Sequence, residues 1–431
     1  MRDTGRKGVR INFYCPVGFE PWDYRNVEHG IGGSETCVCE MSWRLARRGY
    51  DVTVYGHLGD GCESEWRDVR WRQIEECDPS EEALWIIHRS PVDVGKPWNG
   101  QVWLMCQDVD YGGWSDEVFS RVDVVMALSG VHARHLARKH PEIAEKIRIT
   151  SNGVRVDLFE KVEKDGVERN PRRLIWASSP DRGLAQAVLP LWPKIRERVP
   201  DAELHVYYGF DNIDKMVAGN PEQWGWIGKI RDRCLEYFDR YSGQGVIWHG
   251  RVGQEELYRA WLSSSVWPQF SDFTETSCVV SMEAQAGGAI PITRPWWAVG
   301  ENVKHGVFVN GSAYDDPLAR ARLVDETCVM LLDEELQNAI RPSMMEEARI
   351  RCDWERIVDQ WQQWIHGWPS SAMWQYAFQH QHIEAPVINI GANCDSSDLK
   401  SRGAFNVDCR DVDPGTGWQN RVDLIADEGH P

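Results

Sequence analysis

The chain has 431 residues, which is more than a single hydrophobic core normally supports, so its length predicts two or three domains. Hydrophobic residues make up 42% of the chain and charged residues 26%, and this composition excludes a disordered, collagen-like or coiled-coil protein. The formal net charge of −18 disfavours nucleic acid as a partner but does not exclude it, because positive side chains could still gather on one face.

The pattern of apolar residues and cysteines limits the class of protein further. No uninterrupted apolar run approaches the roughly 18 residues that span a membrane, and residues 1–10 do not resemble a secretory signal. We therefore expect a cytoplasmic protein without a transmembrane segment. The twelve cysteines are scattered and form no pair with zinc-ligand spacing, which predicts reduced, structural thiols and no metal site.

Predicted strands and helices alternate along the chain. A strand at residues 9–13 precedes a helical repeat of apolar residues at Val38, Met41 and Leu45, and a second strand follows at residues 52–54. A polar stretch at residues 160–170 is typical of a linker. Beyond it we expect strands at residues 174–176, 204–208, 246–248 and 290–292, and helices at residues 184–191 and 255–264.

This alternation predicts an α/β fold, because strands that alternate with helices form parallel sheets covered on both faces. We expect two facing Rossmann-like domains, at residues 8–165 and 171–352, and a short α/β tail at residues 382–431. Residues 353–368 are expected to form a helix. We expect packing to be the role of its tryptophans. Its apolar face would carry Trp354, Val358, Trp361 and Ile365.

The first chemical signal is a glycine-rich loop at residues 30–35, which follows the first strand and opens the first helix. The main-chain amides of Gly32 and Gly33 can approach a ligand closely, and a helix N-terminus favours an anion, so the loop suits a phosphate. Ser34 is expected to cap the helix. An ordinary glycine turn remains an alternative, because the loop lacks the full dinucleotide-binding spacing.

The second signal is a pair of glutamates, Glu275 and Glu283. We expect the first in a loop and the second within the apolar helix that follows, so that one carboxylate lies at the mouth of the helix and the other on its flank. Ionised carboxylates accept hydroxyl hydrogen bonds well, and a nucleotide sugar offers hydroxyls at both ends. The alternative is a capping glutamate followed by a solvated one.

Five segments together resemble one family of enzymes. They are GGSE at residues 32–35, SNGVRVDLF at 151–159, SSPDRGL at 178–184, HGRV at 249–252, and the glutamate pair. Their order is similar to that of the retaining glycosyltransferases of family 4, which have the GT-B architecture of two Rossmann-like domains and a C-terminal crossover helix. The resemblance covers about residues 8–368 of this sequence.

The resemblance implies transfer of a hexose or related sugar from a UDP-, GDP- or ADP-sugar to a hydroxyl acceptor, without a metal or other cofactor. The N-terminal domain would lie on the acceptor side, and the acceptor could be a glycan, a lipid-linked sugar, a protein or a modified nucleobase. Glu283 would hold the ribose hydroxyls of the donor, Glu275 the hydroxyls of the transferred sugar, and Arg182 the diphosphate. Further donor contacts are expected from Gly32, Gly33, Ser178, Arg251, Thr276, Ser277 and Cys278.

Catalysis by such a site depends on charge. Arg182 would stabilise the leaving diphosphate and Glu275 would position the sugar, and no protein nucleophile is required. The alternatives are a nucleotide-sugar-binding protein without turnover and an enzyme that also transfers methyl groups. In the first, donor affinity would persist without transfer or hydrolysis.

The sequence departs from the family pattern at several positions. Thr276, Ser277 and Cys278 replace glycines, so the backbone after Glu275 is less free. Gln107 stands where relatives have a histidine, so it can donate a hydrogen bond but cannot act as a base at neutral pH. Asp108 and Asp110 resemble a D-x-D metal motif, for which a strand-end turn is the expected role. Four N-terminal tryptophans could stack on a sugar, although packing is favoured: Trp85, Trp98, Trp103 and Trp114.

The C-terminal tail resembles another kind of domain. Residues 386–393 and 404–408 are similar to the opening of the S-adenosylmethionine-dependent methyltransferases, in which a strand is followed by a glycine turn and a second strand ends in an acid. About 50 residues cannot form that fold's sheet or a comfortable core. A truncated or remnant domain docked on the transferase is therefore expected.

Overall fold

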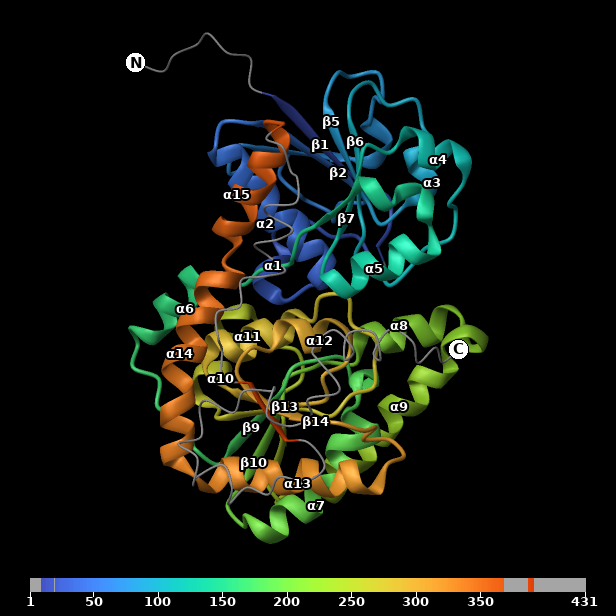
Figure 1. The fold of residues 1–431 in the computed structure, drawn as a ribbon. Coiled ribbons are helices and arrows are strands. Elements are labelled where there is room, and N and C mark those ends of the chain that lie inside the picture. Colours follow the sequence, from blue (N-terminus) through green and yellow to red (C-terminus); the bar gives the residue numbers. More distant parts are fainter. Residues whose placement is uncertain (1–8, 19, 368–386, 391–431) are drawn as a thin grey trace, which may run out of the picture. The chain divides into compact units, whose positions relative to one another are not determined.

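The computed structural model describes residues 9–18, 20–367 and 387–390 (Figure 1). These residues form two compact units. The first unit consists of the chain up to Gly153 together with the segment that starts at Cys352, and the second contains Val154–Arg351 and the short strand at residues 387–390. Each unit is built on its own sheet.

The first unit contains an eight-stranded sheet with the order β3-β4-β2-β1-β5-β6-β7-β8. All neighbouring strands are parallel except β3 and β4. The strands are β1 (Arg10–Cys15), β2 (Asp51–Gly56), β3 (Glu65–Trp66), β4 (Val69–Gln73), β5 (Leu84–His88), β6 (Val102–Met105), β7 (Val124–Ala127) and β8 (Ile147–Ile149).

Helices cover both faces of this sheet, and alternate side chains of each strand enter two different cores. In β5, Ile86 belongs to the core under α2 and α15, whereas Trp85 and Ile87 belong to the core on the opposite face. A strand buried on both faces is characteristic of a parallel sheet. The helices are α1 (Asn26–His29), α2 (Gly33–Arg47), α3 (Pro91–Val94), α4 (Asp116–Arg121), α5 (Gly130–Lys139) and α15 (Trp354–Ile365).

The second unit contains a parallel sheet with the order β11-β10-β9-β12-β13-β14-β15. Its strands are β9 (Arg173–Trp176), β10 (Glu203–Val206), β11 (Val246–Trp248), β12 (Val266–Gln269), β13 (Ile290–Thr293), β14 (Gly306–Val309) and β15 (Val387–Ile390). Its α-helices are α6 (Val156–Glu163), α7 (Leu189–Arg198), α8 (Asp211–Gly219), α9 (Pro221–Arg240), α10 (Gln254–Ser263), α11 (Val279–Gly287), α12 (Trp297–Asn302), α13 (Pro317–Leu332) and α14 (Glu334–Cys352).

The α/β fold predicted from the sequence is confirmed, and one detail of its organisation is wrong. Residues 160–163 were expected in a linker but form the last turn of α6, where Val162 is fully buried. Glu163, at the end of this helix, accepts two hydrogen bonds from Arg349 at 2.7 and 2.8 Å. Glu163, one of the charged residues that suggested a linker, therefore holds the end of a helix in place.

Tryptophans fill the cores, as the sequence favoured. Trp85, Trp98 and Trp103 are at most 5% exposed, and only Trp114 of the four N-terminal candidates is partly exposed. On α15, Trp354 and Trp361 are buried in the core of the first unit, so the predicted packing role is confirmed. The Trp361 indole donates a hydrogen bond to the Thr150 hydroxyl at 2.7 Å.

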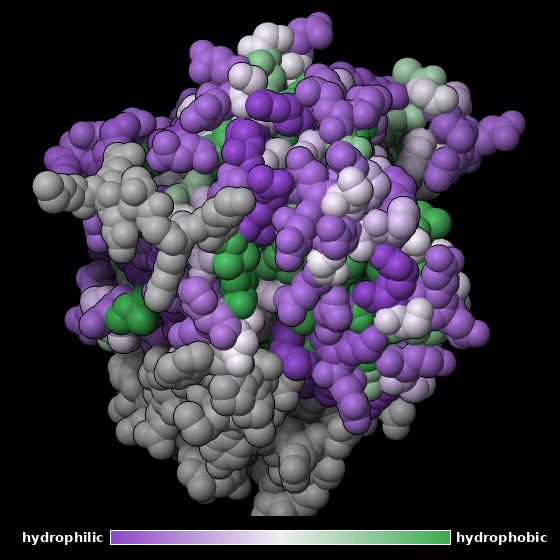
Figure 2. All heavy atoms as spheres, turned by 90° about the horizontal axis from the view of Figure 1, so that it is seen from above, coloured by the Kyte–Doolittle hydropathy of each residue, from purple (hydrophilic) through white to green (hydrophobic). Residues whose placement is uncertain are grey.

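The methyltransferase-like prediction for residues 382–431 lies outside the described residues, apart from strand β15, which pairs in parallel with β14. In the part of the chain that the structure describes, no helix is both long enough and apolar enough to cross a membrane. Hydrophilic residues dominate the face of the molecule drawn in Figure 2, and hydrophobic residues appear there in small separate groups.

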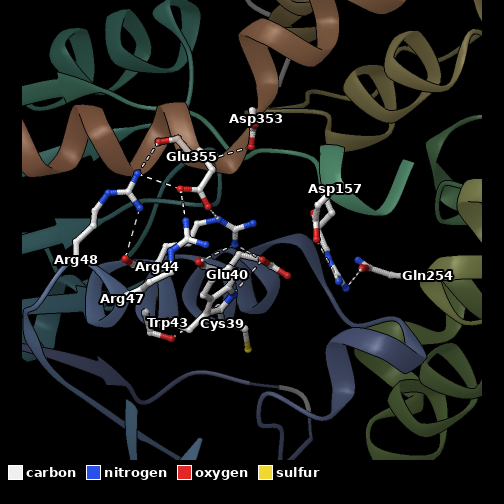
Figure 3. A network of polar contacts seen from close by, with 12 residues as sticks. Cys39, Glu40, Trp43, Arg44, Arg47, Arg48, Asp157, Gln254, Asp353 and Glu355 are labelled. Carbon is white, nitrogen blue, oxygen red and sulfur yellow. Dashed lines mark hydrogen bonds and ion pairs between the residues drawn. The ribbon is translucent and has the colours of Figure 1, made fainter. Parts of the chain in front are cut away.

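An ion-pair network joins α15 to α2 within the first unit (Figure 3). The Glu355 carboxylate lies 2.9 Å from Nε of Arg44, 2.6 Å from Nη2 of Arg47 and 3.0 Å from Nη2 of Arg48. Arg44 is buried and also pairs with Glu40 on its own helix. Burial acts to raise the pKa of Glu355, but the three guanidinium groups outweigh it and lower that pKa.

We expect Glu355→Gln to lower the free energy of unfolding by about 1 kcal/mol at neutral pH, a modest value because water reaches part of this carboxylate. The folded-state pKa is below the ordinary value of 4.5, so this contribution is present above pH 4.5 and disappears as the pH falls through the folded-state pKa. Urea unfolding at several pH values, with hydrogen exchange in α2 and α15, measures it.

Asp359→Asn is the matched control, because Asp359 pairs with Arg48 and its side chain is more exposed. Its effect should be smaller. An equal loss for both variants, or a Glu355→Gln effect that persists at acid pH, would contradict this account of the network.

Candidate active site

The candidate site of the second unit lies at the carboxyl ends of β9 and β12, which are neighbours in the sheet. From β9 the chain proceeds to β10 and β11 on one side, whereas β12, β13 and β14 lie on the other. Such a point of reversal leaves a crevice at the carboxyl edge of a parallel sheet, where ligands bind. The loops that follow β9 and β12 carry Arg182 and Glu275.

The turn that carries Arg182 depends on a glycine. Arg182 ends a 3₁₀ turn after β9, and Gly183 follows with φ of 112°. A Cβ atom at Gly183 would lie 3.0 Å from the Phe270 carbonyl oxygen, so only glycine fits without displacement. The turn that carries Arg182 therefore packs directly against the chain at the end of β12.

The structure brings Arg182 and Glu275 together. Nε of Arg182 lies 3.4 Å from Oε1 of Glu275, and Nη1 lies 3.1 Å from Oδ2 of Asp181. The guanidinium also covers the Phe273 ring, with 3.2 Å between Cζ and the ring centroid. Burial raises the pKa of Glu275, and the charge of Arg182 acts in the opposite direction. The cation and the carboxylate therefore share one partly buried location.

Thr276, Ser277 and Cys278 connect Glu275 to α11. Cys278 is the N-cap residue and has φ of 51°, a left-handed conformation that a residue with a Cβ adopts only at a cost. Asn302 of α12 donates a hydrogen bond to the Ser277 carbonyl and fixes the loop. The buried Ser277 hydroxyl has no hydrogen-bond partner among the described residues.

The N-terminus of α11 therefore presents main-chain amides beside Glu275, and no side chain in the described part of the chain caps it. Unsatisfied amides and the helix dipole together favour an anion at this position. Cys278 thus adopts the left-handed conformation that glycine favours, although the three non-glycine residues predicted a less free backbone here.

Three arginines satisfy the opposite end of α11. Consecutive carbonyl groups each accept a hydrogen bond from a different guanidinium: Ala286 from Arg349, Gly287 from Arg169 and Gly288 from Arg341, at 2.9, 2.9 and 3.0 Å. The carbonyls of residues 284 and 285 accept the main-chain amides of residues 289 and 288. The carbonyls that the helix itself leaves unpaired are thus satisfied, and positive charge lies at the negative end of the dipole.

Glu283 lies in the middle of α11 and is buried. Burial raises the pKa of Glu283 to about 7, while the Trp261 and Tyr258 side chains of α10 act in the opposite direction. The position of Glu283 on the helix, and of Glu275 in the preceding loop, is the one predicted from the sequence. The carboxyl group is therefore poised between its two protonation states near neutral pH.

Ser178 and Arg251 lie in two loops of the same edge, after the strands on either side of β10. Ser178 follows β9 and is buried, and its carbonyl accepts a hydrogen bond from the Trp176 indole at 2.7 Å. Arg251 follows β11 and is exposed. Burial raises the pKa of Tyr208, and the charges of Arg182 and Arg251 both oppose it, so Tyr208 lies near both cations. These residues surround the end of β10.

The glycine loop belongs to the first unit, where α2 starts at Gly33. The prediction that Ser34 caps this helix is wrong, because Gly32 is the N-cap residue and Ser34 lies inside the first turn. The Ser34 hydroxyl instead donates a hydrogen bond to Oε2 of Glu35 at 2.7 Å. A Cβ atom at Gly32 would lie against the Glu35 carboxylate, the end of a flexible side chain that would have to move aside.

The D-x-D segment follows β6, and its two aspartates have different surroundings. Asp110 pairs with Lys139 and with His140, and its pKa is lowered to about 2 although burial acts to raise it. Asp108 pairs with Arg89. Among the described residues, no group of three histidines, cysteines or acids is placed to hold a metal ion. The Gln107 side chain exchanges two hydrogen bonds with Asn152, at 3.2 and 3.4 Å.

Solved structures are similar to this chain in fold. Sucrose-phosphate synthase from Thermosynechococcus elongatus matches with a TM-score of 0.61 and 14% identity, over 83% of this chain and 98% of its own. A glycosyltransferase from Rickettsia africae matches with 0.59 and 14%, over 82% and 97%. HepE from Anabaena, solved with UDP-glucose, matches with 0.57 and 15%, over 83% and 100%.

The fold is that of the GT-B glycosyltransferases. No protein-family model and no curated protein sequence matches the chain. At 14 to 15% identity the three structures establish the GT-B fold of this chain but not its substrates. Helix α11 and the turn after β9 therefore belong to a known architecture.

Phe273 and Arg89 are residues of these sites that were not predicted from the sequence. Phe273 supports the Arg182 guanidinium, and Arg89 pairs with both Glu35 and Asp108. Arg89 has a signal in the sequence, because it follows an apolar run that ends a central strand, the place where parallel sheets carry functional groups. No spacing in the sequence singles out Phe273.

We expect Glu283→Gln to raise the free energy of unfolding at pH 8 by about 2 kcal/mol relative to the wild type. The folded-state pKa of about 7 is above the ordinary 4.5, so the wild type loses stability as the pH rises through this window, whereas glutamine has no proton to release. Urea unfolding at pH 5 and pH 8 measures it. Parallel stability curves for the two proteins would contradict the raised pKa.

Proposed function

We propose that this chain is a retaining glycosyltransferase of family 4 that transfers a sugar from a nucleoside-diphosphate sugar to a hydroxyl group, without a metal ion. The observation that carries the proposal is the approach of Arg182 to Glu275 at 3.4 Å, beside the uncapped N-terminus of α11. A diphosphate needs cations and amide donors, a sugar needs an acceptor of hydroxyl hydrogen bonds, and this location offers all three.

The chemistry follows from where charge develops. As the bond between the anomeric carbon and the diphosphate breaks, negative charge grows on the departing phosphate oxygens. Arg182 and the α11 amides would stabilise that charge in a partly buried environment, in which such interactions are stronger than in water. The main-chain amides of Gly32 and Gly33 remain predicted phosphate donors. Glu275 would hold the sugar through its hydroxyls.

The nucleoside would occupy the other end of the same edge. Glu283 lies on α11, one to two turns beyond the diphosphate position, where its carboxyl group would accept the ribose hydroxyls. Ser178, Arg251, Thr276, Ser277 and Cys278 would complete the donor contacts. The unpartnered, buried Ser277 hydroxyl supports this assignment, because native structures rarely leave such a group without a partner.

The comparisons support the proposal through the fold and through what the similar proteins bind. HepE from Anabaena has been solved with UDP and with UDP-glucose. The shared GT-B fold makes the same class of donor the first to test for this chain, whereas the acceptor could be a glycan, a lipid-linked sugar, a protein or a modified nucleobase.

A panel of UDP-, GDP- and ADP-sugars tests the function. The correct donor should raise the melting temperature by mass action and should be hydrolysed slowly in the absence of an acceptor. Hydrolysis separates an enzyme from a protein that only binds nucleotide sugars. A melting temperature that no nucleotide sugar changes would refute the proposal.

For the donor that passes this test, we expect Arg182→Ala to lower kcat by roughly a hundredfold, with a smaller change in the donor KM, because the leaving group gains charge only as the bond breaks. Steady-state hydrolysis with and without a chelator measures both. Arg251→Ala is the comparison, since a cation that only binds the nucleotide should act mainly on KM. A strict requirement for magnesium or manganese would contradict the proposed mechanism.

A further inference from the structure

A row of polar side chains crosses one face of the sheet in the second unit, on the edge strand β11 and its neighbour β10. Successive side chains of a strand point to opposite faces of the sheet. Leu204 and Val206 of β10 enter the hydrophobic core. Glu203, His205 and Tyr207 therefore lie on the other face.

Two histidines from adjacent strands meet on this face. His249 directly follows β11, and its main-chain amide donates to the Val206 carbonyl at 2.9 Å, which extends the pairing of the two strands. Its Nε2 atom lies 3.0 Å from Nδ1 of His205. Each of these nitrogens can present a lone pair, so at this separation a proton or a cation must lie between them.

A carboxylate holds the second nitrogen of His205. Nε2 of His205 lies 3.2 Å from Oε2 of Glu203, and the same oxygen accepts hydrogen bonds from Arg173 and from the Asn170 amide, each at 3.1 Å. The carboxylate favours the tautomer that has its proton on Nε2 and a free lone pair on Nδ1. Histidines that bind metal ions in proteins almost always have such a partner on the second nitrogen.

The ring of His249 is held by stacking and is open to solvent. Its centroid lies 4.2 Å from that of the Tyr207 ring, and the two planes differ by 2°. His249 is exposed, whereas His205 is buried. An ion from solvent would therefore reach the pair at one ring, while hydrogen bonds fix the other.

The charges around the pair favour a cation. Burial lowers the pKa of His249, the negative charge of Glu256 on α10 opposes this effect, and Arg173 acts with burial, so both charges lie near the ring. Glu203 pairs with Arg173, which leaves the charge of Glu256 in excess.

The distance between the two nitrogens indicates the kind of ion. Bonds of about 2.0 Å from each nitrogen to a shared ion would meet there at nearly a right angle. That angle suits the square-planar or octahedral geometry of Ni²⁺ and Cu²⁺, and a small separation of the rings would suit tetrahedral Zn²⁺. Mg²⁺ and Ca²⁺ are disfavoured because they prefer oxygen ligands.

We propose that His205 and His249 form a binding site for a divalent transition-metal ion, with Glu203 as its positioning residue. When the ion binds, the proton that His249 shares with His205 moves through solvent to the second nitrogen of His249, so both rings remain neutral ligands. Among the described residues no third histidine, cysteine or acid is placed to bind the ion, so water would complete its coordination.

The site was not predicted from the sequence, because 44 residues separate the two histidines and no spacing connects them. The bound ion would link the edge strand β11 to β10 and stabilise the folded chain by mass action. This site is independent of the proposed function, in which no metal ion takes part.

Isothermal titration of the full chain with Ni²⁺, after treatment with a chelator and desalting, tests the proposal. We expect saturable binding by the wild type, an increase in its melting temperature with Ni²⁺, and no such response to Mg²⁺. His249→Gln should weaken the binding by at least roughly tenfold, and it should fold normally because His249 is exposed.

Two further variants separate metal binding from other effects. Glu203→Gln keeps both ligands but loses the carboxylate, so it should weaken Ni²⁺ binding by roughly tenfold to a hundredfold without abolishing it. His57→Gln is the matched control, because it removes an exposed histidine of the first unit and should leave the affinity unchanged. Thermal melting without metal checks that each variant is folded.

Three results would overturn the inference. The first is the absence of saturable Ni²⁺ binding by the wild type. The second is equal affinity of the wild type and His249→Gln, which would mean that the ion binds elsewhere and adventitiously. The third is equal affinity of the wild type and Glu203→Gln, which would exclude the positioning role. Failure of the proposed function is measured separately, with nucleotide sugars.

Discussion

The direction of the dipole of helix α11 is the constraint on which the second unit depends. Arg169, Arg341 and Arg349 bind the carbonyls at its C-terminal end, so the helix is fixed there by three charged hydrogen bonds. Because the C-terminal end of α11 is fixed, the position of its N-terminal end is also fixed. That end carries the uncapped amides beside Glu275 and Arg182, and the glutamate on its flank is Glu283. The cations are remote from the proposed chemistry and still determine where the positive end of the dipole lies.

Both units carry charged side chains at the carboxyl edge of a parallel sheet, but they use different residues. A parallel sheet places all the carboxyl ends of its strands at one edge, and the reversal of strand order opens a crevice there. In the second unit a cation, Arg182, and an acid, Glu275, come from the strands on either side of that reversal. In the first unit Arg89, which follows β5, pairs with Glu35 in the first turn of α2. The same topology thus places a largely buried pair of opposite charges at the carboxyl edge of each sheet.

Periodicity was enough to predict the strands and helices that have clear apolar patterns, such as β1, α2 and β9, and hence the α/β class. It did not give α8 or α9, in which few residues are buried, or β12, which has four residues. The order of motifs placed Glu275, Arg182 and Glu283, but no spacing in the sequence predicts that the first two lie 3.4 Å apart. The cap assigned to Ser34 failed because α2 begins at Gly33, with Gly32 as the N-cap residue, and a sequence pattern does not fix a helix boundary to one residue.

The buried carboxyl of Glu283 couples the protein to the proton concentration. Its pKa of about 7 means that a substantial fraction of molecules carry a proton there at neutral pH. A ligand whose hydroxyls donate to Glu283 favours the ionised form, so its binding expels a proton into the solvent. The measured heat of binding then includes the ionisation of the buffer, and the apparent affinity increases as the solution becomes more alkaline. A carboxyl group buried in an apolar helix would thus make sugar recognition a proton-linked equilibrium.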